Sequence, residues 1–268
     1  MHFCLYHHII INFDLVKITF LGTGTSQGVP VIACKCATCK SDDPRDKRLR
    51  ASVLVEHQDR VVIIDTGPDF RQQMLSASVA RLDAVVFTHE HRDHIAGLDD
   101  IRAYNYLQDQ PMDVYGEARV LRALQHTFPY IFAERKYPGI PQVNFHQIGI
   151  EPFSVEGIEI IPVRAYHYRL PVLGYRIGDF TYITDANFIA PEELEKIKGT
   201  RYFTICALRK RKHISHYSLS EALEVIKLVR PEHAYLTHVS HLMGSHAETT
   251  PELPDNVSFA WDGLSFDV

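Results

Sequence analysis

The sequence has no long apolar run and no excess of basic residues. A membrane-spanning helix needs about 20 consecutive apolar residues, and no segment of the 268-residue chain provides them. The net charge is −5 at pH 7, so nothing draws the chain generally toward anionic lipid or nucleic acid. We therefore expect no membrane association, and the charge weighs against a nucleic-acid partner.

Cysteine is also scarce, and three of the five cysteines lie together as Cys34, Cys36 and Cys39. Disulfides between such close neighbours would be strained, and an odd count makes a poor disulfide scaffold. This usage predicts a reducing, cytoplasmic environment. A C-x-C-x-x-C pattern can offer three thiolates to one metal, so it predicts a structural zinc knuckle at 34–39 whose fourth ligand comes from elsewhere. Reduced loop cysteines without a metal are the alternative.

The chain shows no internal repeat, low-complexity tract or linker. Residues 1–11 are apolar but lack the basic residues and the small-residue cleavage site of a secretory signal. We therefore expect an N-terminal extension over 1–16 and a single domain over 17–268.

Apolar patterning and turn residues predict an α/β chain in which strands alternate with helices. The predicted strands cover 17–21, 52–56, 61–65, 82–88, 143–148, 158–166, 173–177, 181–184, 202–207 and 234–236. One predicted helix follows Pro68, and the others cover 95–107, 118–132, 191–197 and 219–229. The helix over 118–132 could cover a site.

The most informative segment follows the apolar run 84–87 and holds four metal-ligand side chains within six residues: His89, His91, Asp93 and His94. Imidazole and carboxylate suit zinc, manganese and iron. Histidines two residues apart point to opposite faces of a strand and also diverge on a helix. The cluster therefore predicts a tight loop around a metal, against the alternative of a polar loop rich in histidine.

Further ligand candidates stand at or just beyond the ends of later predicted strands, where α/β proteins place their chemistry. They are His167, Asp185, His238 and, three residues on, His241. Each alone is more often a loop or core residue. Together with the first cluster they suffice for two metal centres.

These motifs resemble the metallo-β-lactamase-fold hydrolases, and more narrowly the PhnP-like phosphodiesterases that act on phosphoribosyl cyclic phosphate. The resemblance covers about 17–268 and excludes 1–16. It rests on the metal loop, the cysteine knuckle, Asp185 and the segments 21–24, 27–30, 236–241 and 262–263.

The resemblance implies an αββα four-layer sandwich with a dinuclear centre and a separate structural zinc. The first metal would be held by His89, His91 and His167, and the second by Asp93, His94 and His238, with Asp185 bridging them. The structural zinc would be held by Cys34, Cys36, Cys39 and His241, although His246 competes by chemistry for the fourth place. The catalytic metals would be zinc or manganese.

The implied activity is hydrolysis of a small cyclic phosphate, phosphoribosyl or nucleoside, by a metal-dependent phosphodiesterase. Two cations can share a hydroxide and polarise phosphoryl oxygens. His216 occupies the position of the family's general acid, with an exposed histidine before a helix as the alternative; His213 is a weaker candidate. The basic run 209–212 could attract phosphate, or it could be a solvated loop.

Two other functions stay open at this stage. A tRNase Z-like endonuclease would need a long basic arm, and the chain offers only the four-residue basic run. A non-catalytic metal-binding or sensing protein would normally have lost some of the ligands. An exported β-lactamase fits poorly, since the chain lacks an export signal. Relatives suggest a homodimer acting on a small phosphodiester substrate.

Overall fold

The computed structural model describes residues 15–134 and 137–268. The predicted extension 1–16 lies outside the described residues except for its last two, and Val16 already belongs to the first strand. Within the described ranges, no helix is long and apolar enough to cross a membrane.

The first half of the described chain builds a seven-stranded mixed sheet, hereafter the first sheet, in the order β15-β1-β2-β3-β4-β5-β6. Its strands are β1 (Val16–Gly22), β2 (Ser52–His57), β3 (Arg60–Ile64), β4 (Ala84–Val86), β5 (Met112–Gly116), β6 (Val143–Gln147) and the C-terminal β15 (Ser265–Asp267). Strands β3 to β6 run parallel, so their carboxyl ends share one edge.

The second half builds the second sheet, in the order β11-β8-β9-β10-β12-β13-β14, with β7 beside β8. Its strands are β7 (Phe153–Val155), β8 (Ile158–His167), β9 (Leu170–Ile177), β10 (Phe180–Ile183), β11 (Phe188–Ile189), β12 (Tyr202–Cys206), β13 (His233–Thr237) and β14 (Val257–Phe259). Strands β10, β12, β13 and β14 are parallel neighbours.

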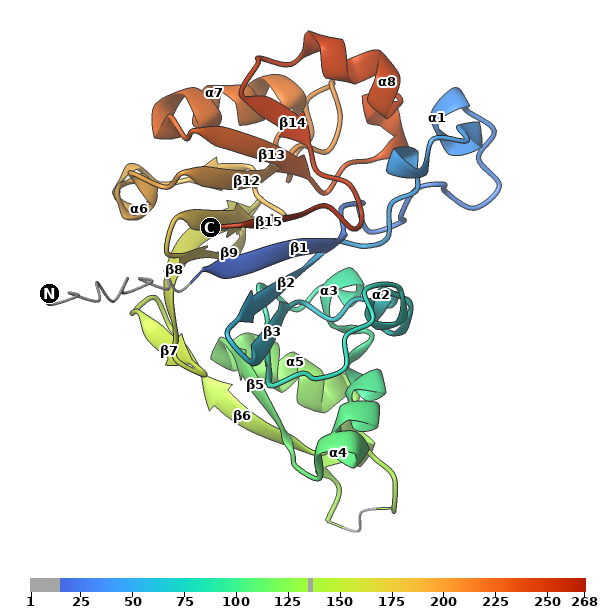
Figure 1. The fold of residues 1–268 in the computed structure, drawn as a ribbon, viewed down its shortest axis with the longest axis vertical. Coiled ribbons are helices and arrows are strands. Elements are labelled where there is room, and N and C mark those ends of the chain that lie inside the picture. The colour runs from blue at the N-terminus through green and yellow to red at the C-terminus, as the bar shows by residue number, and fades with distance from the viewer. Residues whose placement is uncertain (1–14, 135–136) are drawn as a thin grey trace, which may run out of the picture.

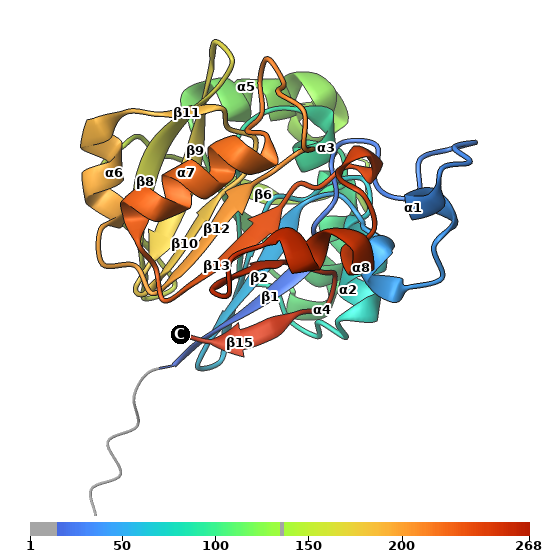
Figure 2. The same ribbon diagram turned by 90° about the horizontal axis from the view of Figure 1, so that it is seen from above.

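Helices cover the outer face of each sheet, which makes the predicted αββα sandwich (Figure 1). The first sheet carries α2 (Phe70–Ser76), α3 (Arg92–Ile95), α4 (Arg102–Gln108) and α5 (Ala118–Thr127), and the second carries α6 (Pro191–Ile197), α7 (Leu219–Val229) and α8 (His246–Thr249). One apolar core lies between the sheets and one under each helical layer. The short α1 (Ala37–Lys40) projects from the side of the sandwich (Figure 2).

The prediction of one continuous helix over 95–107 is wrong. The chain forms α3, a 3₁₀ turn at Leu98–Ile101 and then α4. The break lies at Gly97, whose N–H donates to the carbonyl of Thr66. A Cβ at Gly97 would lie 2.1 Å from the carbonyl oxygen of Gly67, so only glycine allows this close approach.

The predicted helix over 118–132 ends early, and several short strands escaped prediction. Helix α5 stops at Thr127, because Pro129 disfavours helical geometry at Phe128, and a 3₁₀ turn follows. The helix packs on the first sheet through Val120, Leu121 and Leu124. The strands β7, β11, β14 and β15 have two or three residues each, too few for a clear period-2 pattern. Strand β5 was also missed, although its burial alternates along its length.

Candidate metal centre

The strand ends of both sheets bring the predicted ligands together at one edge of the sandwich. The metal loop follows β4, His167 ends β8, and Asp185 and His238 follow β10 and β13. Ligand atoms of Asp93, His94, Asp185 and His238 all lie within 4.8 Å of one another. The same holds for His89, His91 and Asp185, and for His167, Asp185 and His216.

Sharp backbone turns aim these side chains. Asp65 and His238 directly follow β3 and β13, and Asp185 lies two residues after the end of β10. All three adopt a positive φ, of 64°, 55° and 47° respectively. A positive φ is uncommon for residues other than glycine, and such conformations concentrate at functional sites. The turns therefore mark this edge of the sandwich as a site that the rest of the fold holds in place.

The two carboxylate oxygens of Asp185 face different groups of histidines. Oδ1 lies 3.3 Å from His94 Nε2 and 2.9 Å from His238 Nδ1. Oδ2 lies 3.8 Å from His89 Nε2 and 4.0 Å from His216 Nδ1. A carboxylate placed in this way can give one oxygen to each of two cations.

The histidines are satisfied on their outward side and unsatisfied on their inward side. The outward Nδ1 atoms of His89, His94 and His167 lie 3.0, 2.7 and 2.7 Å from Thr88 Oγ1, Asp65 Oδ2 and the carbonyl of Ser215. Among the described residues, the inward buried Nε2 atoms of His89 and His94 have no hydrogen-bond partner, and neither ring nitrogen of His238 has one. Buried polar atoms without partners are costly. Their convergence fits a cation, and the outward bonds fit the supporting contacts of metal-ligating imidazoles.

Asp65 belongs to this site and was missed as a site residue in the sequence. Its fully buried carboxylate accepts hydrogen bonds from the Thr88 N–H at 2.8 Å and the Thr88 hydroxyl at 2.7 Å, besides its contact with His94. The sequence did indicate a possible site residue here, because Asp65 ends a predicted strand. In the structure this strand runs parallel to β4, which precedes the metal loop.

Charges in the site are strongly coupled. Burial opposes a charge on His94, yet the carboxylates of Asp93, Asp185 and Asp65 hold its pKa well above the ordinary range. Burial likewise opposes ionisation of Asp185, but His238 and His94 hold the pKa of this carboxyl well below its usual value. Burial lowers the pKa of His89 well below the ordinary value. Without a metal, the ionised carboxylates thus keep a proton on His94 while His89 stays neutral. Carboxylate and imidazole together are a donor set suited to divalent metals.

The cysteine knuckle also assembles around a common centre. Ligand atoms of Cys34, Cys36, Cys39 and His241 lie within 4.8 Å of one another. His241 Nδ1 is 3.3 Å from the sulfur of Cys34 and 3.4 Å from that of Cys36. A tetrahedral zinc with ordinary Zn–S and Zn–N bonds would place sulfur and nitrogen about 3.5 Å apart. The competing candidate, His246, is not in this group, and its main-chain N–H binds Asp46.

His216 lies beside the histidine cluster. Its ring centroid is 4.4 Å from that of His167 and 4.9 Å from that of His238. It is buried, and burial lowers its pKa to about 3, so the imidazole is neutral at pH 7 in the free protein. His213 lies farther out, with its ring 5.2 Å from that of His216.

The basic run 209–212 is largely occupied by contacts within the protein. Arg209 donates to the carbonyls of Arg211 and Lys212, while Lys210 and Lys212 pair with Glu252 and Glu221. In Figure 2 this loop rises beside the β8–β9 turn at one edge of the second sheet. These contacts account for the basic residues of this run without a bound phosphate group.

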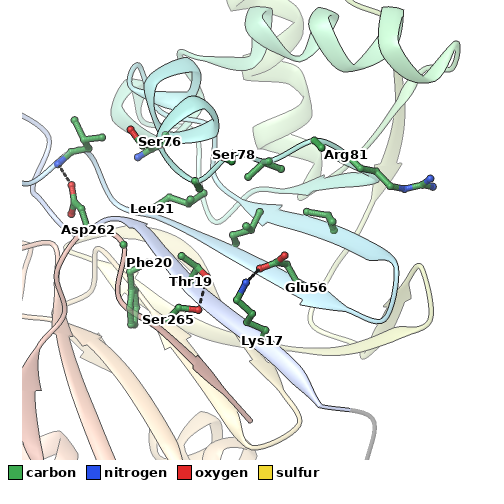
Figure 3. A pocket seen from close by; sticks show the side chains of 18 residues that line it. Lys17, Thr19, Phe20, Leu21, Glu56, Ser76, Ser78, Arg81, Asp262 and Ser265 are labelled. Carbon is green, nitrogen blue, oxygen red and sulfur yellow. Dashed lines mark hydrogen bonds and ion pairs between the residues drawn. The ribbon is translucent and has the colours of Figure 1, made fainter. Parts of the chain in front are cut away.

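A hollow of about 760 Å³ lies on the outer face of β1 and β2 (Figure 3). The ion pair between Lys17 and Glu56 and the hydrogen bond between Thr19 and Ser265 cross its floor. Its lining includes none of the candidate metal ligands, so the chemistry of this hollow differs from that of the site.

Comparison with known proteins places the chain in a family. Residues 60–239 match the model of the β-lactamase superfamily domain. A crystal structure described as that of a new diphosphatase from the PhnP family has a TM-score of 0.88 and 38% sequence identity, covering 94% of this chain and 98% of the other. This chain belongs to the metallo-β-lactamase superfamily, in its PhnP branch. The αββα fold and the converging ligand set fit the metal-binding domain of that superfamily.

Other members of the superfamily are more distant or longer. The octanoyltransferase of Porphyromonas gingivalis is 39% identical over 252 residues, a match that covers 93% of this chain and 51% of that protein. The chain spans about half the length of the curated relatives it matches. Human tRNase Z, short form, has 18% identity and a TM-score of 0.66 over 93% of this chain and 98% of its own, and so shares the fold.

Proposed function

We propose that this metallohydrolase cleaves a small cyclic phosphodiester, such as a phosphoribosyl or nucleoside cyclic phosphate. The observation that carries the proposal is Asp185, whose two oxygens face two separate groups of histidines. We assign the first group as His89, His91 and His167, with the rings of His91 and His167 5.0 Å apart, and the second as Asp93, His94 and His238. Each group would hold one divalent cation, zinc or manganese, with Asp185 shared.

Two bound cations would supply a nucleophile from water at neutral pH and would stabilise charge on the phosphoryl oxygens. The chain's own residues do the remaining work. Asp65 fixes the ring of His94 by accepting from Nδ1, which leaves Nε2 free for the cation. The carbonyl of Ser215 does the same for His167.

The knuckle would hold a third, structural zinc through Cys34, Cys36, Cys39 and His241. The segment that carries His238 also carries His241, and Val239 exchanges backbone hydrogen bonds with Thr23 and Thr25. A closed zinc site at this point would stiffen the loop that delivers His238 to the cluster.

His216 is the residue we assign as general acid. The alkoxide that leaves an ester needs a proton, and a buried imidazole beside the reacting phosphate can deliver one. Because His216 is neutral at pH 7 in the free protein, the negative charge of the bound substrate must raise its pKa. His216 also lies within ligand distance of His167 and Asp185, so a role as a metal ligand is the outcome that competes with this assignment.

The test combines metal analysis with a leaving-group series on wild type and His216→Ala. We expect about three metals per chain in both proteins, from the ligand counts. Loss of a general acid should slow cleavage of cyclic phosphodiesters by about 10²- to 10⁴-fold, and the loss should shrink for aryl esters, whose leaving groups need no proton. His213→Ala is the matched control and should keep most of the activity.

Three results would change the assignment. Full activity of His216→Ala on every substrate removes the general acid but leaves the metal site. Loss of one metal in this variant makes His216 a ligand. Wild type that binds its metals yet cleaves no phosphoester, pre-tRNA included, overturns the enzymatic proposal.

A second candidate reaction is hydrolysis of a diphosphate, which the 38% identical PhnP-family diphosphatase favours. The same ligand set suits both reactions. Phosphate leaves more easily than an alkoxide, so a diphosphatase should depend less on His216. Faster turnover of diphosphates than of cyclic diesters, with only a small effect of His216→Ala, would favour this second reaction.

A further inference from the structure

Glu90, which lies between His89 and His91 in the metal loop, is linked through Arg119 to the second sheet. Glu90 accepts a hydrogen bond from Arg119 Nη1 at 2.5 Å, and Arg119 Nη2 donates to the carbonyl of Pro171. Arg119 lies in the first turn of α5, and Pro171 lies in β9. The two charged side chains are only 22% and 25% exposed, so solvent screens their pairing incompletely.

This contact joins the two sheets that supply the ligands of the first metal group. His89 and His91 come from the first sheet, whereas His167 comes from β8 in the second sheet. Pro171 is the register partner of Tyr166, the residue before His167. Arg119 therefore joins a neighbour of His89 and His91 to the strand that pairs beside His167.

The surrounding charges hold Arg119 in this position. Its Nε lies 3.4 Å from Glu117, which is held in turn by two hydrogen bonds from Arg164, at 2.8 and 2.6 Å. Arg164 lies in β8, three residues before His167. The guanidinium thus reaches the metal loop, β9 and, through Glu117, β8.

The second metal group has separate ties between the sheets. Val239, next to His238, donates to the carbonyl of Thr23 at 2.9 Å and accepts from the N–H of Thr25 at 3.2 Å. Asp65 orients His94 from within the first sheet. These contacts do not involve Arg119.

We propose that Arg119 is a positioning residue that sets the spacing between His89, His91 and His167, and so governs affinity for the cation of the first group. The inference rests on the proposed dinuclear centre. A guanidinium is suited to the task because its planar fork can donate to Glu90 and Pro171 together, whereas a lysine ammonium is a compact point charge.

The experiment is a manganese titration of wild type, Arg119→Lys, Arg119→Met and Glu90→Gln, with Arg122→Met as the control. Arg122 is an exposed residue of the same helix. The readouts are bound manganese per chain and the electron paramagnetic resonance signal, which distinguishes an exchange-coupled pair from an isolated ion. The knuckle is first loaded with zinc so that manganese reports the paired site.

In the Arg119 variants we expect the first-group ion to bind about 10- to 100-fold more weakly, the usual effect of losing an outer support of a metal ligand. At limiting manganese the coupled signal should give way to that of a single ion, and excess manganese should restore it. Glu90→Gln should show a smaller shift in the same direction, and Arg122→Met should behave as wild type.

Coupled pairs that form at wild-type manganese concentrations in Arg119→Lys and Glu90→Gln would overturn the inference. Equal weakening of both ions would also overturn it, because it would show a general loosening of the fold. If the Arg119 variants fail to fold, Glu90→Gln still decides, since its side chain keeps the same shape. Wild type that binds no manganese pair would instead defeat the proposed dinuclear centre.

Discussion

Replacing Asp65 by asparagine allows the effect of this carboxylate on metal affinity to be measured separately from its effect on folding. The carboxylate receives hydrogen bonds from the Thr88 N–H and hydroxyl and faces His94 Nδ1 at 2.7 Å. Asparagine has one acceptor oxygen in place of two. If that oxygen stays with the Thr88 N–H, the new NH₂ group faces His94 Nδ1, which must then give up its proton.

Without a proton on Nδ1, His94 would keep its remaining proton on Nε2, the atom that lies 3.3 Å from both Asp93 and Asp185. A protonated Nε2 cannot bind a cation, so binding must reverse this change. A hydrogen bond to a charged group is worth about 1.5–3 kcal/mol, and each factor of ten in affinity corresponds to about 1.4 kcal/mol. We therefore expect second-group affinity to fall by about 10- to 100-fold, in line with known outer-ligand substitutions.

Competition against a chromophoric chelator measures the affinity, and thermal unfolding in the presence of a strong chelator measures the metal-free fold. Asp83→Asn is the matched control, because Asp83 is also a buried carboxylate, and it binds Arg81 and the Val61 N–H instead of a candidate ligand. It should lower stability and leave metal affinity unchanged. An Asp65→Asn protein whose affinity stays within about twofold of wild type would refute the role given to Asp65.

Two further predictions concern the knuckle and pH. Cys36→Ser should remove one zinc per chain and lower the melting temperature while the paired metals remain, as measured by metal analysis and calorimetry; retention of all the zinc would contradict the proposed knuckle site. Burial raises the pKa of Asp262 to about 6, against the lowering effect of donors from Leu49 and Thr23. A carboxyl with a raised folded pKa contributes stability below its unfolded pKa and loses it as pH rises through the folded value. Between pH 4 and 7, wild type should therefore lose on the order of 2 kcal/mol more unfolding free energy than Asp262→Asn in urea titrations; equal losses would contradict the raised pKa.

The chemistry of this protein could be predicted because metal ligands are marked locally in a sequence. Four ligands within His89–His94 and the spacing of Cys34, Cys36 and Cys39 already indicate metal binding. The helices Pro191–Ile197 and Leu219–Val229 were predicted to the residue, since both carry clear start signals: a proline in the first turn and a capping box at Ser218.

Local patterns could not predict what depends on contacts between distant segments. The break at Gly97 comes from the backbone of Gly67, which packs against it from another loop. Asp65 supports His94 from 29 positions away, and Arg119 meets Pro171 across 52 positions. The position of Asp65 at the end of a predicted strand suggests a site residue, but its neighbours in the chain do not identify His94 as its partner.

The sequence alone determined which atoms can bind metal, because thiolate, imidazole and carboxylate keep their chemistry in any fold. Only the tertiary structure decided how those atoms are divided. It places Asp185 between two groups of histidines, His241 rather than His246 beside the cysteines, and His216 beside His167 and Asp185. The physical reason is that each group joins strand ends from two sheets, and the packing of those sheets fixes distances that no local pattern contains.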